Sequence, residues 1–472
     1  MRVGVIGAGP AGMTAAYELA KSPGVQVDLF ETTDRVGGMA GTFELWGQKV
    51  DFGPHRFFSS DPRVNAVWRE TVGDKFAMVS RLTRIFYNHR FFYYPLRAFN
   101  ALANLGLAEA SRCLLSYGWE KVCPTRAGTE PSFEEWVVQR FGRRLYEIFF
   151  KTYSEKLWGI PCSELDADFA AQRIKKFSLS EAVKTMFHGN KGNRHKTLVD
   201  QFAYPLGGSG YVYSEMCRAI TEKGGQVHFR SPVRRVLLNG QRAIGIELED
   251  GKFFYADHIV SSMPITRLVE GFEGVPSAVK QAVSELRFRN TILVYLRVDA
   301  PNLFPDNWIY VHSKELRSGR ITNFRNWVPS LYGDERATVV ELEFWCYDND
   351  ILWKERDEEL IALARRELEA TGLVSGQVIL EGTVRRLAWS YPVYALGYKK
   401  AVAIVQAYLR SIDGLSVIGR YGAFKYNNQD HSILMGLMAA RNIVLGERND
   451  LWGINTDYEY QESALLMKTG VV

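Results

Sequence analysis

Three glycines near the N-terminus have the spacing G-x-G-x-x-G, which can hold a pyrophosphate against the backbone. They are Gly7, Gly9 and Gly12. A β-branched run at residues 3–6 precedes them and a helical pattern at 13–19 follows, the order that this motif requires. A second predicted strand, 25–30, ends at Glu31, whose carboxylate can accept from the hydroxyls of an adenosine ribose. These residues favour a dinucleotide site over an unrelated glycine-rich turn.

The segment after Glu31 indicates which dinucleotide binds. Residues 33–38 read T-D-R-V-G-G and resemble the R-x-G-G segment of FAD enzymes of the glutathione-reductase-like and amine-oxidase-like groups. The resemblance implies FAD as cofactor, with its adenine end at the N-terminal loop and with Arg35, Gly37 and Gly38 beside it.

A polar loop near the C-terminus could stabilise an anion. It lies between a predicted strand at 415–419 and a predicted helix at 431–445, for which Asp430 is the expected N-cap. The positive end of that helix suits the pyrimidine edge of a flavin, where negative charge develops on reduction. The residues alone leave this interpretation and an ordinary capped helix equally open.

The same loop resembles the flavin-binding segment of UDP-galactopyranose mutases, and similar motifs are spread over most of the chain. The loop positions that the resemblance assigns to the cofactor are Gly419, Arg420, Asn428, Gln429, Asp430 and Ser432. Residues 50–58 resemble the stretch in which the mutases place a histidine near the flavin, here His55. Residues 153–161 resemble the motif Y-x-x-K-x-W-x-x-P. The resemblance implies a mutase-like flavoprotein within the amine oxidase and protoporphyrinogen oxidase-like superfamily.

The resemblance also implies a substrate site for a nucleotide sugar. Its residues are Tyr94, Arg97, Arg173, Arg320, Tyr391 and Tyr426. Arg173 and Arg320 would hold the diphosphate, and with His55 they are the candidate catalytic residues. In the mutases reduced flavin N5 attacks the anomeric carbon and expels UDP, and the adduct recloses on a different hydroxyl without net redox. Guanidinium forks and phenols suit such a leaving group, although each arginine judged alone favours a surface ion pair.

Three departures from the mutase pattern leave the sugar and the nucleotide open. Leu96 and Arg97 replace the aromatic and the amide that grip uracil in mutases, and Pro54 replaces a glycine before His55. The alternative function is an FAD-dependent oxidase or desaturase of the amine oxidase and protoporphyrinogen oxidase type. A non-catalytic FAD-binding scaffold is a third hypothesis, against which the polar loop argues.

Composition narrows the class of protein. The chain has 472 residues, a formal charge of +5 and no dense Lys/Arg block, which argues against nucleic acid and fits a small anionic substrate. Five cysteines without a C-x-x-C pair predict reduced thiols and a cytoplasmic location. No convincing metal site or Ser-His-Asp triad is present. No second G-x-G-x-x-G marks an NAD(P)H domain, so we expect an external reductant such as NAD(P)H.

The pattern predicts a Rossmann-like, glutathione-reductase-like FAD domain that is not contiguous, with a mixed-sheet substrate domain and an inserted helical domain. The expected segments are FAD domain at 1–61, 201–285 and 411–450, helical insert at 62–200, mixed sheet at 286–410 and a loosely ordered tail at 451–472. Residues 98–117 predict an amphipathic helix that packs within the substrate side. No apolar run reaches 18 residues, so no membrane span is expected. Peripheral membrane contact and a homo-oligomer remain open.

Overall fold

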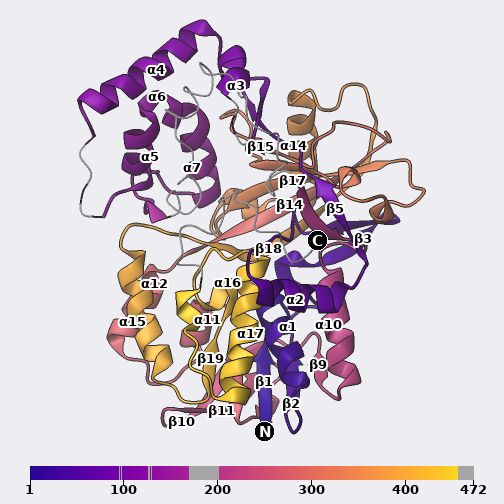
Figure 1. The fold of residues 1–472 in the computed structure, drawn as a ribbon, viewed down its shortest axis with the longest axis vertical. Coiled ribbons are helices and arrows are strands. Elements are labelled where there is room, and N and C mark those ends of the chain that lie inside the picture. The colour runs from indigo at the N-terminus through magenta and orange to yellow at the C-terminus, as the bar shows by residue number, and fades with distance from the viewer. Residues whose placement is uncertain (95, 97, 126–127, 129, 169–200, 455–472) are drawn as a thin grey trace.

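The structure is a computed structural model, which describes residues 1–94, 96, 98–125, 128, 130–168 and 201–454. Two sheets dominate it, one in the lower half of Figure 1 with the N-terminus and one in the upper half. A group of helices lies beside the upper sheet, at the upper left. The expected fold, a dinucleotide-binding α/β part with a mixed-sheet part and a helical insert, is confirmed.

The lower sheet is parallel and has five strands in the order β19-β13-β1-β2-β9. The strands are β1 Arg2–Ile6, β2 Gln26–Phe30, β9 Gln226–His228, β13 His258–Ser261 and β19 Leu415–Val417. They come from three separate stretches of the chain. Their apolar residues, such as Val3, Leu29 and Ile259, have no exposed surface, because helices and a small antiparallel sheet pack on the faces of the parallel sheet.

Helices and a small antiparallel sheet complete this part. The helices are α1 Pro10–Ala20, α2 Pro62–Val72, α10 Tyr211–Glu222, α11 Ile265–Glu270, α12 Ser277–Glu285, α15 Tyr398–Arg410, α16 Gly419–Gly422 and α17 Gln429–Leu445. The small sheet is β10 Val233–Asn239, β11 Arg242–Leu248 and β12 Phe253–Tyr255. Its strands are joined by short turns at 240–241 and 249–252, where glycines at 240 and 251 have positive φ angles.

The upper sheet is mixed and has seven strands in the order β18-β14-β17-β16-β15-β6-β7. The strands are β6 Thr83–Tyr87, β7 Arg90–Tyr93, β14 Phe288–Val298, β15 Trp308–Val311, β16 Arg320–Asn323, β17 Thr338–Cys346 and β18 Ile379–Pro392. On one face Ile292, Val294 and Leu296 pack in a cluster with α14 Asp357–Ala370. On the other face Leu293 and Tyr295 belong to a second cluster, so the central strand β14 is buried on both sides.

The helical part contains α3 Ala98–Leu105, α4 Leu107–Val122, α5 Phe133–Phe141, α6 Arg143–Tyr146, a π-helical turn Glu147–Lys151 and α7 Thr152–Trp158. The single helix predicted at 98–117 is wrong, because Gly106 divides it into α3 and α4. The π turn separates α6 from α7 within an otherwise α-helical stretch.

Strands within 62–200 were not foreseen. The hairpin of β6 and β7 turns at Asn88 and His89, whose φ angles of 47° and 57° are those of a type I′ turn. Histidine is an unusual residue for that turn, so the pattern gave no hairpin signal. Two further pairs are β3 Thr42–Leu45 with β4 Gln48–Asp51, and β5 Phe76–Ser80 with β8 Gln201–Pro205.

The chain after Asp450 is ordered further than expected. Leu451, Trp452 and Ile454 are buried, and the buried ammonium of Lys425 donates to the carbonyls of Trp452 and Ile454. That anchor makes the expectation of a loose tail wrong for 451–454, and residues 455–472 lie outside the described part. The remaining short elements are α13 Ile351–Lys354 and 3-10 turns at Gly38–Ala40, Phe324–Asn326, Pro329–Leu331 and Leu451–Gly453. Among the helices that the structure describes, none is long and apolar enough to cross a membrane.

Candidate active site

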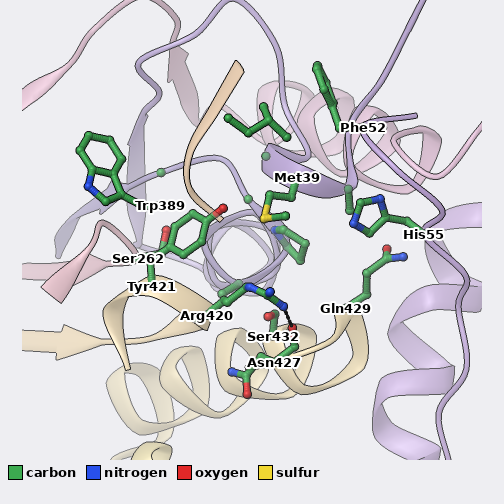
Figure 2. A pocket seen from close by; sticks show the side chains of 18 of the residues that line it. Met39, Phe52, His55, Ser262, Trp389, Arg420, Tyr421, Asn427, Gln429 and Ser432 are labelled. Carbon is green, nitrogen blue, oxygen red and sulfur yellow. Dashed lines mark hydrogen bonds between the residues drawn. The ribbon is translucent and has the colours of Figure 1, made fainter. Parts of the chain in front are cut away.

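A cavity of about 760 Å³ lies between the two main sheets. Its walls come from the carboxyl ends of β1 and β2, from the start of α17 and from β15, β16 and β18 of the upper sheet. Ligands of open parallel sheets bind at this edge. Figure 2 shows side chains that line it, among them His55, Arg420 and Gln429.

The glycine loop leaves room for a group at its second glycine. A Cβ on Gly9 would meet no atom within 4 Å, and this residue begins α1 with no side-chain cap. A Cβ on Gly12, by contrast, would lie 2.0 Å from the carbonyl oxygen of Gly7, so that glycine serves the packing of helix on strand. The open space beside an uncapped helix N-terminus fits a pyrophosphate.

Glu31 is held at the end of β2 by backbone donors. The Ala8 amide donates to its Oε2 at 2.8 Å, and the Thr33 amide donates to its Oε1 at 2.9 Å. Glu31 lines the cavity beside Gly7 and Gly9, as expected for a ribose acceptor. The residues present therefore fit the dinucleotide that the motif predicts.

The R-x-G-G segment packs against the same loop. The Gly37 amide donates to the Ala8 carbonyl at 2.8 Å, and a Cβ on Gly38 would lie 3.1 Å from Gly9 Cα. Arg35 and Gly38 line the cavity, whereas Gly12 and Gly37 support the loop from behind. Arg35 Nε is 3.0 Å from Asp34 Oδ1, and its guanidinium lies over the ring of Phe52 at 5.6 Å.

Helix α17 points its N-terminus at the cavity. Its N-cap is Asn428, so the assignment of that role to Asp430 is wrong, because the helix begins two residues earlier than the pattern predicted. Asn428, Gln429, Asp430 and Ser432 all line the cavity. The Tyr213 hydroxyl donates to Gln429 Oε1 at 2.7 Å, which fixes the amide at the cavity wall.

Arg420 holds the loop before α17 in place through hydrogen bonds to backbone carbonyls. Its guanidinium donates to the carbonyls of Ser390 and Asn427 at 2.9 and 2.8 Å, the second bond being drawn in Figure 2. It lies over the ring of Tyr426 at 4.2 Å and over that of Tyr391 at 4.8 Å. The cation thereby joins the cofactor-side loop to two of the predicted substrate tyrosines.

His55 is a neutral imidazole in the cavity wall. Its Nδ1 is 3.1 Å from the Gly53 carbonyl oxygen, and because a carbonyl only accepts, Nδ1 carries the hydrogen and Nε2 presents a lone pair. Burial lowers its pKa to about 3, with the charges of Arg320 and Arg420 acting in the same direction. This histidine can accept a hydrogen bond at neutral pH but carries no charge there.

Arg320 reaches the cavity from β16 and is held from behind by Glu343 on β17. Glu343 accepts from Nε at 2.6 Å and from Nη2 at 2.7 Å. Burial raises the pKa of Glu343, which the Arg320 charge opposes. Burial beside Glu343 also raises the pKa of Glu341 well above its ordinary value, which favours the neutral acid. Nη1 of Arg320 makes no hydrogen bond to the described residues, so it could bind a ligand.

Tyrosines surround Arg320. Tyr391 and Tyr426 stack with ring centroids 5.5 Å apart, and Tyr310 meets Tyr94 edge to face at 5.1 Å. All four line the cavity. Burial raises the pKa of Tyr391, so its phenol stays protonated and can donate to an anion.

Two predicted substrate residues, Arg97 and Arg173, lie outside the described residues. Glu343 was missed, although acids at 341 and 343 in an otherwise apolar strand were a signal, since a buried charge requires a partner. Trp389 was also missed. It stands at a register shift of β18 with a φ of 55° and lines the cavity (Figure 2), and no sequence pattern announces such a bulge. No group of three metal-ligating side chains occurs within the part of the chain that is described.

Comparisons with known proteins agree with a flavin site. The model of the flavin containing amine oxidoreductase family matches residues 10–401. Coproporphyrinogen III oxidase of Mycobacterium tuberculosis is 23% identical over 436 residues, which cover 88% of this chain and 92% of that protein. A probable UDP-galactopyranose mutase of Klebsiella pneumoniae is 27% identical over 38% of this chain and 46% of its own length. The solved structure of a reduced UDP-galactopyranose mutase superimposes with a TM-score of 0.84 at 21% identity and covers 96% of both chains.

Proposed function

The chain belongs to the flavin containing amine oxidoreductase family, and we propose that it is an FAD-dependent mutase of a nucleotide-diphosphate sugar. The observation that carries the proposal is that four tyrosines line the cavity together with Arg320. Hydrogen-bond donors of this kind suit the oxygens of a diphosphate, and protonated phenols add no negative charge.

The charge balance of the cavity supports an anionic substrate. Glu343 neutralises the charge of Arg320, so the pair adds little net charge to the cavity. Its contribution would be to orient a bound anion through hydrogen bonds from the guanidinium group. Arg81, Arg385 and Arg420 also line the cavity, and they supply the positive charge that a diphosphate needs.

The bound flavin would supply a nucleophilic or redox-active ring. The residues of the chain have separate tasks around it. Glu31 and the open space at Gly9 would hold the adenosine and the pyrophosphate. The backbone at the start of α17 and the fixed amide of Gln429 favour negative charge at the ring edge. Arg320 and the phenols would bind the leaving diphosphate and keep it near the sugar until it returns.

The alternative is an FAD-dependent oxidase or desaturase of the amine oxidase and protoporphyrinogen oxidase type. The extent of sequence similarity favours it, since the mycobacterial oxidase matches 88% of this chain and the mutase of Klebsiella pneumoniae only 38%. The cationic lining of the cavity is also compatible with a carboxylated substrate.

Turnover under two redox conditions separates the alternatives. The purified protein is incubated with UDP-galactofuranose and a panel of other nucleotide sugars, under dithionite without oxygen and again in air. Ring isomerisation only in the reduced protein supports the mutase. Oxygen uptake with a porphyrinogen or an amine, and no isomerisation, would replace it with the oxidase. Inactivity in both, with tight FAD binding, would favour the scaffold.

Arg320→Ala is the matched variant, and Arg297→Ala is its control. Arg297 lies on β14 of the same sheet and is also ion-paired, with Glu335 and Glu381, but it does not line the cavity. Loss of turnover in both variants would show a general effect on the sheet rather than a substrate contact.

A further inference from the structure

Helix α4 exposes an unusual row of large apolar side chains. The exposed fractions are 89% for Leu107, 48% for Leu114, 74% for Leu115, 69% for Trp119 and 78% for Val122. These five residues are called the α4 stripe below. Exposed apolar residues are normally scattered singly, and a contiguous row marks a surface that binds something.

The stripe follows one side of the helix. At 100° per residue its members fall within an arc of about 140°. The opposite side is buried: it carries Ala110, Cys113 and Glu120, and α4 packs against α5 and α6. The apolar stripe therefore looks outward, and α4 lies at the outer margin of the helical part in Figure 1. This overturns the expectation that the helix packs its apolar face inside the protein.

Cations border the stripe on both sides. On the same helical projection Arg112 falls at one edge of the arc and Lys121 at the other, and both are exposed. The acids of α4 are not available at this surface. Glu120 is buried and accepts from the Thr125 backbone, and Glu109 is ion-paired with Arg144 and, at 3.2 Å, with Arg112. Lys121 is therefore the bordering cation that has no acidic partner among the described residues.

We propose that the α4 stripe docks on an anionic lipid bilayer. A helix with leucines and a tryptophan on one face and basic residues at its borders lies in the headgroup region, with the apolar face among the upper acyl chains. The long stems of Arg112 and Lys121 would let their charges reach lipid phosphates. Trp119 suits the same depth, because its ring is apolar and its N–H needs a polar partner.

Charge complementarity favours lipid over a second copy of this chain. A two-fold pairing of the stripe with itself would bring the cationic edges of two copies together, whereas an anionic bilayer opposes them with negative charge. The helix is about 24 Å long and one-sided, so it would lie in the membrane plane and not span it. This inference does not depend on the substrate of the cavity.

Vesicle flotation tests the proposal. The purified FAD-loaded full-length protein is mixed with vesicles of phosphatidylcholine, or of phosphatidylcholine with phosphatidylglycerol. We expect binding to the anionic vesicles, weaker binding to the neutral ones, and a loss of at least tenfold in the double variant Leu115→Glu/Trp119→Glu. Arg112→Glu/Lys121→Glu should abolish the preference for phosphatidylglycerol. Ile351→Glu is the matched control, since Ile351 is 80% exposed on α13 and should leave binding unchanged.

Several outcomes would overturn the proposal. Absence of binding to either vesicle is one, and equal binding by Leu115→Glu/Trp119→Glu is another. Light scattering tests whether a second copy of the chain covers the stripe. A dimer that Leu115→Glu/Trp119→Glu dissociates would show that it does. The flavin absorbance spectrum of each variant checks that the fold is intact.

Discussion

Glu343 holds Arg320 at the cavity wall by accepting from two of its three guanidinium nitrogens, at 2.6 and 2.7 Å. The side chain of Glu343 is almost fully buried, so it depends on Arg320 for its charge partner. Arg320 therefore has a role in stability besides its proposed role at the substrate site. A single substitution of Arg320 would change both stability and substrate binding.

A pair of variants separates the two roles. Arg320→Ala should lower the free energy of unfolding by about 3–5 kcal/mol, because it leaves a buried carboxylate unpaired. Adding Glu343→Gln should recover most of that stability in urea unfolding. Both variants lack Arg320, so both should bind UDP more weakly than wild type. We expect the binding free energy measured by calorimetry to be smaller by roughly 2–4 kcal/mol. A double variant that binds UDP like wild type would remove Arg320 from the substrate site.

The flavin is expected to be FAD held without a covalent bond. The motivation is the glycine loop with Glu31, together with the absence of a recognised flavinylation context at any histidine or cysteine. The purified protein should be yellow, and acid precipitation should release all of the flavin into the supernatant. Flavin that stays with the precipitate would contradict this.

Gly9 and Gly12 should respond in opposite ways to alanine. Gly9 has an extended backbone and open space at its Cβ, so Gly9→Ala should keep the apoprotein melting temperature. The methyl group would intrude on the pyrophosphate and weaken FAD binding by about tenfold, or 1.4 kcal/mol. Gly12→Ala would collide with Gly7 and should unfold the domain. Differential scanning fluorimetry with and without FAD measures both effects.

Gln429 should influence the flavin potential. Its Oε1 accepts from Tyr213, which fixes the amide group at the start of α17. Gln429→Ala removes a polar group beside the proposed ring edge, and we expect a lower midpoint potential in a dye-coupled titration. His55→Ala should also shift the potential, while Tyr213→Phe should give a smaller change because the amide remains. Unchanged potentials in Gln429→Ala and His55→Ala would place both residues away from the ring.

Sequence alone predicted the local elements of the cofactor site better than the substrate site. The loop of Gly7, Gly9 and Gly12 works through backbone spacing, which a short motif encodes. The partnership of Arg320 with Glu343 depends on the pairing of β16 with β17, which is a long-range register. The apolar face of α4 was predicted to be buried because periodicity shows that a face is apolar but not which neighbour covers it.

The partly buried His258 should make stability sensitive to acid. Its Nε2 lies 2.9 Å from Ser416 Oγ, and desolvation lowers its pKa to about 4 from the ordinary 6.5. The folded protein therefore resists a proton that the unfolded chain accepts below pH 6.5. The contribution of neutral His258 to the free energy of unfolding is complete above that pH and is lost as the pH falls towards 4.

Asp51, whose pKa burial raises to about 7, acts in the opposite direction. The pH dependence of wild-type stability alone therefore does not report on His258. The difference between wild type and His258→Gln isolates the histidine. We expect wild type to exceed the variant in free energy of unfolding at pH 7.5, and this advantage to shrink at pH 5 in urea titrations at both values. An advantage that stays constant would mean that His258 titrates normally in the folded protein.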